Sequence, residues 1–243
     1  MNRIIFWLNK IITILVVRMK NSMGSSWHLV SGIYLPIYSE IGFDTLRWIL
    51  NEQYEIGEID IVKAKLEQND IVLEVGTGLG FVSAYCAKIV GSENVFTFEA
   101  NPLNVELAKR VFEKNKVHPY IENAMLGNQN GETSFPINKK SRLASSINVS
   151  QEENATVKIL PINKVIQDKK PSFLAMDIEG AEYDVFKIIN FQTIQKIQFE
   201  LHPLILGKGK CDEIFDILRN NGFLLDNQIS KGQNYFFYIA DIK

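Results

Sequence analysis

Long apolar runs, cysteines and net charge are all scarce in this sequence of 243 residues. Asn9 and Lys10 interrupt the apolar segment at residues 4–20, whose longest clean run, residues 11–17, is far short of the roughly 20 residues that cross a bilayer. No small-residue cleavage site follows that run, so neither a spanning helix nor a secretory signal is predicted. The two cysteines, Cys86 and Cys211, predict a reducing, cytoplasmic environment without a disulfide framework. A formal net charge of −2 gives no reason to expect nucleic-acid binding.

No acidic residue occurs before Glu40. Arg3, Lys10, Arg18 and Lys20 precede it, and polar residues gather on one side of a helical projection of residues 1–20. A basic amphipathic helix of this kind suits an anionic membrane surface. Packing of the same helix on its own domain or on a second subunit is the alternative, and both stay open.

Beyond Glu40, short apolar runs alternate with helical periodicity, which is typical of a parallel sheet covered by helices. We expect core strands at 71–75, 95–99, 118–123, 172–177 and 196–203, and a closing antiparallel hairpin at 223–226 and 234–240. Asn101 and Pro102 predict the start of a helix that ends near Asn115. The sequence therefore predicts an α/β fold with a seven-stranded, mostly parallel sheet. We divide it into an extension at residues 1–53 and a domain at 54–243.

Residues 132–160 interrupt this alternation with a long polar stretch. A connection of this length inside a compact domain is usually functional or disordered. We expect the part from Lys139 to Asn154 to act as a mobile loop over the site.

A glycine loop follows the first core strand in the stretch LEVGTGLGF. Backbone N–H groups between a strand and a helix can face a ligand, and glycines let it approach closely. The spacing differs from the Gly-x-Gly-x-x-Gly of dinucleotide folds, because Phe81 stands at the last position of that pattern. Glu99, at the end of the next strand, is suited to accept the hydroxyl groups of a ribose.

These features resemble class I S-adenosylmethionine-dependent methyltransferases and, more narrowly, the FkbM-type family. The stretches that carry the resemblance lie within residues 54–203 and read LEVGTGLGFVS, VFTFEANPLNVELAKRVFEKN, NAMLGNQNGETSF, MDIEGAEYDVFK and FELHP. The resemblance implies a Rossmann-like fold, S-adenosylmethionine as cofactor and a methyltransferase of the EC 2.1.1 type. It also implies a hydroxyl acceptor on a sugar, glycan, lipid or natural product.

The resemblance implies three groups of cofactor contacts. Glu74, Gly76, Thr77, Gly78 and Gly80 would hold the amino-acid end, and Glu99 the ribose, with Ala100 and Asn101 beside it. Asn123, Ala124 and Met125 would border the adenine, and Asp177 would lie next to the reactive methyl group.

Carboxylates gather where two neighbouring core strands end. Asp177 and Glu179 follow one strand, and Glu200 and His202 close the next. We predict that these four surround the reacting atoms, whereas Glu182 is explained by capping the following helix. His202 is one candidate for the base and Asp177 its rival. A divalent metal held by Asp177, Glu200 and His202 is the third, less favoured option, so no metal ligand is assigned.

Two other functions stay open: a catalytically silent S-adenosylmethionine-binding or scaffold module, and an NAD-dependent oxidoreductase. Methylation of nucleobases is disfavoured. Enzymes of that kind typically carry an Asn/Asp-Pro-Pro-aromatic signature after the fourth strand, where this sequence has Asp-Ile-Glu-Gly at 177–180. The identity of the acceptor and the oligomeric state do not follow from the sequence.

Overall fold

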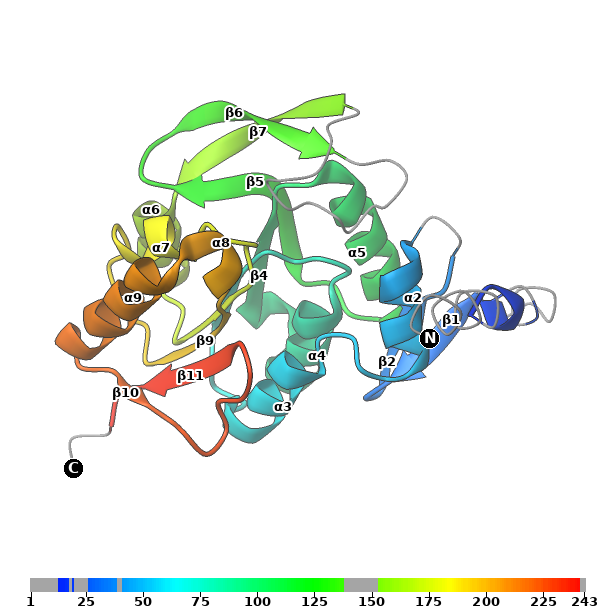
Figure 1. Ribbon diagram of the computed structural model, residues 1–243, viewed down its shortest axis with the longest axis horizontal. Coiled ribbons are helices and arrows are strands. Elements are labelled where there is room, and N and C mark those ends of the chain that lie inside the picture. The colour runs from blue at the N-terminus through cyan, green and yellow to red at the C-terminus, as the bar shows by residue number, and fades with distance from the viewer. Residues whose placement is uncertain (1–12, 18, 20–25, 39–40, 138–152, 241–243) are drawn as a thin grey trace.

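The computed structural model describes residues 13–17, 19, 26–38, 41–137 and 153–240. Its main feature is a sheet of nine strands, drawn in Figure 1 with helices on both faces. The strands of this sheet are β3 (Val72–Val75), β4 (Val95–Glu99), β5 (Tyr120–Gly127), β6 (Gly131–Ile137), β7 (Glu153–Pro161), β8 (Phe173–Met176), β9 (Lys196–Glu200), β10 (Leu224–Leu225) and β11 (Asn234–Tyr238). A separate hairpin pairs β1 (Trp27–Val30) with β2 (Ile33–Pro36).

Helices connect these strands. They are α2 (Phe43–Leu50), α3 (Ile56–Lys65), α4 (Phe81–Val90), α5 (Pro102–Asn115), α6 (Ile162–Lys169), α7 (Glu182–Phe186), α8 (Pro203–Leu206) and α9 (Lys208–Asn220), with a 3-10 turn at Ser92–Asn94.

The strand order is β10-β11-β9-β8-β3-β4-β5-β7-β6. Strands β9, β8, β3, β4 and β5 are parallel, and β11 adds to β9 in the antiparallel sense. The order reverses at β3, from which one half of the sheet runs to β4 and the other to β8. Ligands of open α/β sheets bind at such a switch point, outside the carboxyl ends of the strands.

Two hydrophobic clusters lie on opposite faces of the sheet. In β8, Phe173 and Ala175 belong to one cluster and Leu174 and Met176 to the other, as the two-residue period of a strand requires. The first cluster includes buried residues of α3, α4 and α5, and the second includes buried residues of α6, α7 and α9. Both faces of the central strands are therefore buried, which fixes the edge on which a site can open.

The α/β class, the mainly parallel sheet and the terminal β10–β11 hairpin are confirmed. The predicted count of seven strands is wrong for the part of the chain that the structure describes. β6 and β7 form an antiparallel hairpin, and β7 joins the sheet beside β5. Their polar exposed faces concealed them in the sequence, where residues 132–160 resembled a long connection. The proposed mobile loop lies mostly in residues 138–152, outside the described residues.

Helix ends follow their sequence signals closely. The Asn101 side chain accepts a hydrogen bond from the N–H of Leu103 at 3.0 Å, and Pro102 opens α5 as predicted. Gly91, with φ of +88°, ends α4 in a conformation that side chains rarely adopt.

The N-terminal part packs on the rest of the chain. Val17 is buried in the first hydrophobic cluster, as are Val30 and Leu35 of the small hairpin. Ile14 and Leu15 are exposed. Most of the predicted amphipathic helix lies outside the described residues, so its contact with a membrane stays a prediction. The domain boundary between residues 53 and 54 also stays a prediction. Among the described residues, no helix is long and apolar enough to cross a membrane.

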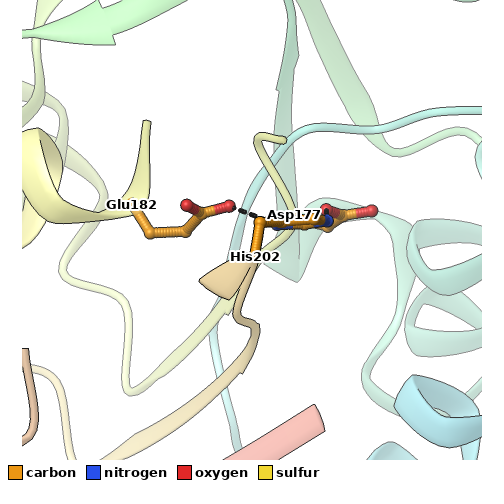
Figure 2. Close-up of side chains that lie close together, drawn as sticks. All are labelled: Asp177, Glu182 and His202. Carbon is orange, nitrogen blue, oxygen red and sulfur yellow. Dashed lines mark hydrogen bonds and ion pairs between the residues drawn. The ribbon is translucent and has the colours of Figure 1, made fainter. Parts of the chain in front are cut away.

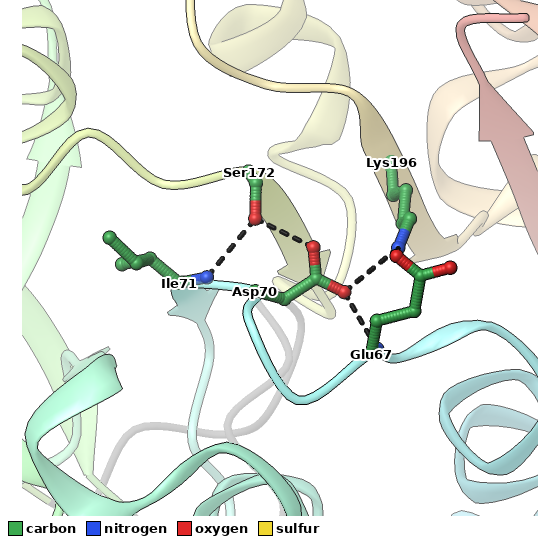
Figure 3. A network of polar contacts seen from close by, with 5 residues as sticks. All are labelled: Glu67, Asp70, Ile71, Ser172 and Lys196. Carbon is green, nitrogen blue, oxygen red and sulfur yellow. Dashed lines mark hydrogen bonds and ion pairs between the residues drawn. The ribbon is translucent and has the colours of Figure 1, made fainter. Parts of the chain in front are cut away.

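A polar network joins the amino ends of three core strands, opposite the carboxyl ends (Figure 3). Asp70 accepts hydrogen bonds from Ser172 Oγ at 2.7 Å, Lys196 Nζ at 2.9 Å and the N–H of Glu67 at 2.8 Å. Ser172 Oγ in turn accepts from the N–H of Ile71 at 3.0 Å. The buried Asp70, just before β3, thus links Ser172 before β8 and Lys196 at the start of β9 through one carboxylate.

We expect Asp70→Ala to lower the free energy of unfolding by about 2 kcal/mol, because it leaves Ser172 without its acceptor and Lys196 with only the exposed Glu67. Urea denaturation measures the change. Asp212→Ala, at an exposed position of α9, is the matched control and should change stability by less than about 0.5 kcal/mol. Equal effects of the two substitutions would contradict this role.

Candidate active site

A cavity of about 860 Å³ opens at the carboxyl ends of the parallel strands. The end of β3, the end of β4 and part of β5 contribute Glu74, Gly76, Gly78, Glu99 and Met125 to its wall. The segment after β8 contributes Asp177 and Glu179, the end of β9 contributes Glu200, and the segment after β9 contributes His202. The cavity therefore occupies the switch point of the sheet.

The glycine loop needs glycine at two positions for different reasons. A Cβ atom on Gly76, whose φ is +88°, would lie 1.7 Å from the carbonyl oxygen of Asp177. One on Gly78 would lie 3.2 Å from Glu55 Oε1 and from the hydroxyl of Tyr54. Gly76 thus lets β3 and β8 end in close contact, and Gly78 keeps the loop open toward the cavity.

Glu99 is fixed by the glycine loop itself. Its Oε2 accepts a hydrogen bond from the N–H of Gly78 at 2.9 Å, and its Oε1 accepts one from the N–H of Asn101 at 2.7 Å. Burial raises the pKa of Glu99 although these backbone groups lower it. Further hydrogen bonds from the side chain of Asn104 and the backbone of Thr77 hold the same carboxylate, so it keeps a fixed orientation in the cavity wall.

The predicted cofactor residues divide into two groups. Eight of them line the cavity: Glu74, Gly76, Gly78, Glu99, Ala100, Ala124, Met125 and Asp177. The other four lie behind this wall and support it. Gly80 precedes α4 against Phe112, Asn101 caps α5, and Asn123 donates to the carbonyl oxygens of Glu99 and Ala100. The hydroxyl of Thr77 contacts that of Thr97.

Glu74 reaches the cavity from within the sheet. The hydroxyl of Thr97 donates to its carboxylate, and burial raises the pKa of Glu74 to about 7. A protonated or half-ionised Glu74 at neutral pH is therefore the expected state of the empty cavity.

His202 lies between carboxylates, as Figure 2 shows. Its Nδ1 is 2.8 Å from Glu182 Oε1, and its Nε2 is 3.7 Å from Asp177 Oδ1 and 3.5 Å from Glu179 Oε2. Glu182 is fully buried and also accepts from the N–H of Gly180. The earlier explanation of Glu182 as a helix cap is therefore wrong, because its carboxylate holds the imidazole. β8 ends at Met176 and Glu179 has a left-handed φ of +53°, so Asp177 and Glu179 do not continue the strand.

The carboxylates change the titration of this imidazole. Burial lowers the pKa of His202, but the hydrogen bond with Glu182 and the charges of Asp177, Glu182 and Glu179 outweigh it and raise the pKa to about 9. Burial, followed by the charges of Glu200 and Glu179, raises the pKa of Asp177 to about 8. The two shifts are linked, because a charged Asp177 raises the pKa of His202 and a charged His202 lowers the pKa of Asp177.

We expect the imidazole of His202 to titrate near pH 9 in the free protein. Glu182→Gln should move that pKa down toward 6.5, because it removes the nearest negative charge and keeps an acceptor oxygen. NMR of labelled histidine in chelator-treated buffer measures both, with His28 and His118 as internal references. An ordinary pKa in the native protein, or one unaffected by Glu182→Gln, would contradict the described geometry.

Charge is distributed very unevenly around the cavity. Among the described residues that line it, seven are acidic and none is lysine or arginine; the seven are Glu55, Glu58, Glu74, Glu99, Asp177, Glu179 and Glu200. Burial leaves several of these acids protonated in the empty cavity, and a cationic ligand favours their ionised forms whereas an anionic ligand opposes them.

The sequence of this site matches a known family. The model of the methyltransferase FkbM domain matches residues 70–225, which include every strand from β3 to β10. The chain belongs to the FkbM methyltransferase family. It is accordingly an S-adenosylmethionine-dependent methyltransferase. No curated protein sequence matches significantly.

Solved structures similar to this FkbM-family chain include two at a TM-score of 0.49 and 14% sequence identity. One is the methyltransferase FkbM from Methylobacillus flagellatus KT, with 82% of this chain and 56% of that chain covered. The other is a methyltransferase from Pyrococcus furiosus, with 95% and 98% covered. The magnesium protoporphyrin IX methyltransferase from Synechocystis PCC 6803, solved with bound SAM, is 11% identical at a TM-score of 0.46, with 82% and 83% covered. At these values the likeness carries no argument about activity, which rests on the family match.

Sequence analysis missed the part of the site that precedes the first core strand. Tyr54, Glu55 and Glu58 line the cavity from the start of α3. Burial raises the pKa of all three well above the ordinary values. One signal was present: Glu58 interrupts the apolar residues of a buried helix, and a buried charge needs a reason.

Proposed function

We propose that this FkbM-family protein transfers the methyl group of S-adenosylmethionine to a hydroxyl group of a small-molecule, glycan or lipid acceptor. The observation that carries this proposal is the position of His202. Its ring is fixed by Glu182 on one side, and its Nε2 faces the same cavity that holds the glycine loop and Glu99. A hydroxyl acceptor requires removal of its proton, and an oriented imidazole is the group suited to that task.

The residues present fit the proposed cofactor. Gly76 and Gly78 leave room beside the loop backbone, and the fixed carboxylate of Glu99 offers acceptors for two ribose hydroxyl groups. Ala124, Met125 and Leu126 form an apolar wall for a base. The acidic lining suits a ligand that carries a sulfonium and an ammonium group.

Bound S-adenosylmethionine supplies an activated methyl group. The chain then has two tasks, to align the acceptor and to accept its proton. We propose that His202 accepts the proton on Nε2 while Glu182 holds the ring through Nδ1 and stabilises the imidazolium that forms. Asp177 and Glu179, within 3.7 Å and 3.5 Å of Nε2, would orient the acceptor hydroxyl.

The alternative of an NAD-dependent oxidoreductase fits the lining less well. The pyrophosphate of such a cofactor carries two negative charges, and its usual partners are loop N–H groups unopposed by acids. Here the N–H of Gly78 already donates to Glu99.

A panel assay tests the choice of a hydroxyl acceptor. The protein is incubated with methyl-labelled S-adenosylmethionine and with acceptors supplied as matched hydroxyl and amine versions of one scaffold. Label is expected on oxygen, with a rate that rises with pH as His202 loses its proton. Transfer mainly to nitrogen would overturn the proposal. The absence of transfer across sugars, glycans, lipids and natural products would favour a silent binding module.

Contact with an anionic membrane and assembly into oligomers remain proposals that rest on the sequence. The exposed Ile14 and Leu15 are consistent with either, because they leave apolar surface on the helical residues 13–17.

A further inference from the structure

Three carboxylates from three different elements converge in the cavity wall. They are Glu58 of α3, Asp177 after β8 and Glu200 at the end of β9, and their nearest ligand oxygens all lie within 4.8 Å of one another. The register explains the meeting. Ala175 pairs with Gln198, so Asp177 and Glu200 each lie two residues further along neighbouring parallel strands. Met176 and Phe199, which directly precede them, belong to the second hydrophobic cluster. Asp177 and Glu200 therefore lie toward the opposite face of the sheet, which α3 covers.

Glu58 is the most unusual of the three. It is only 5% exposed, lines the cavity, and has no hydrogen-bond or ion-pair partner among the residues that the structure describes. Asp177 Oδ1 is also buried without a hydrogen bond in that part of the chain. Buried carboxylates are normally paired, because an isolated one costs several kcal/mol. An unpartnered buried acid that faces a cavity is available to a cation, which would replace its proton.

We propose that Glu58, Asp177 and Glu200 bind one divalent cation. An all-oxygen set of carboxylates selects a hard ion, which makes Mg²⁺ or Mn²⁺ the expected occupant, with water or a substrate oxygen in the remaining positions.

A second set, Asp177, Glu182 and His202, has similar spacing but suits a metal less well. Glu182 Oε1 and His202 Nδ1 are already bonded to each other at 2.8 Å, so a metal there would have to break that bond. In the described part of the chain Glu58 and Glu200 have no hydrogen bond for a cation to break, and the ion would displace only protons.

The bound ion would also activate the acceptor, an inference that rests on the proposed transfer of a methyl group to a hydroxyl. A hydroxyl oxygen bound to the ion becomes more acidic, and His202 lies on the same wall to accept the proton. Asp177 then serves as a ligand, which leaves His202 as the base.

Binding of Mn²⁺ to the full-length, chelator-treated protein tests the site without any acceptor. Calorimetry is expected to find one Mn²⁺ per chain, and electron paramagnetic resonance should show no coupling to a histidine nitrogen. Glu58→Gln should weaken Mn²⁺ binding at least tenfold, and Glu200→Gln should do the same if Glu58→Gln is poorly folded. Glu182→Gln, the matched control from the competing set, should retain it.

Four results would overturn the proposal: no Mn²⁺ binding at millimolar concentration, a nitrogen coupling, an affinity that Glu58→Gln leaves unchanged, or complete displacement of Mn²⁺ by S-adenosylhomocysteine. The last would mean that the acids bind the ammonium group of the cofactor. Cofactor affinity measured in chelator separates failure of the metal site from failure of the proposed function.

Discussion

Glu99→Ala is expected to weaken the binding of S-adenosylhomocysteine at least tenfold. The substitution removes the carboxylate that would accept the ribose hydroxyl groups, and each hydrogen bond to a charged group contributes about 1.5–3 kcal/mol. Glu99 is well placed for this, because the N–H groups of Gly78 and Asn101 fix both of its oxygens. Calorimetry of the two proteins measures the difference.

The same contacts require a control, because Glu99→Ala also leaves two backbone N–H groups without an acceptor. A 2′-deoxy analogue of the ligand separates the two effects in a double-mutant cycle. The native protein should bind the analogue less tightly than the parent ligand, whereas Glu99→Ala should no longer distinguish them. If the variant is folded and discriminates as well as the native protein, Glu99 supports the loop and does not bind the ribose.

Removal of the imidazole is expected to have the largest effect on turnover. His202→Ala should lower kcat by about 10²–10⁴, the usual contribution of a general base, with little change in cofactor affinity. Asp177→Asn should also lose most of its turnover, because it removes a carboxylate 3.7 Å from Nε2. Rates are measured on the acceptor that the hydroxyl panel identifies.

Two controls accompany these variants. His118→Ala, at an exposed position before β5, should keep the native rate. Asp177→Asn should be at least as stable as the native protein at pH 8. The pKa of Asp177 is raised from 3.8 to about 8, so the native fold binds the proton more tightly and loses stability as pH rises through that window. Near-native rates for both site variants would show that the cluster is structural.

The central fold was predictable because its signals are local. Apolar runs marked the five parallel strands, and Asn101 with Pro102 marked the start of α5. The β6–β7 hairpin was not predictable in the same way. Its residues are mostly exposed or half-exposed, and its two strands are separated by residues 138–152, so neither alternation nor a short turn identified it.

The site was predictable only where residues follow a core strand. The ends of β3, β4, β8 and β9 placed Glu99, Asp177, Glu200 and His202 around one cavity. Glu58 and Glu182 depend on packing instead. Glu58 reaches the cavity because α3 crosses the face of β9, and Glu182 because a left-handed turn at Glu179 and Gly180 brings the start of α7 back toward His202. No local pattern encodes either contact.

Titration of the full-length protein with S-adenosylhomocysteine, and separately with NADH, tests the central claim most directly. The described cavity predicts one S-adenosylhomocysteine per chain and no detectable NADH binding, since its lining carries seven acids and no lysine or arginine among the described residues. Binding of NADH, or failure of the folded protein to bind S-adenosylhomocysteine, would contradict the assignment of this cavity as the cofactor site.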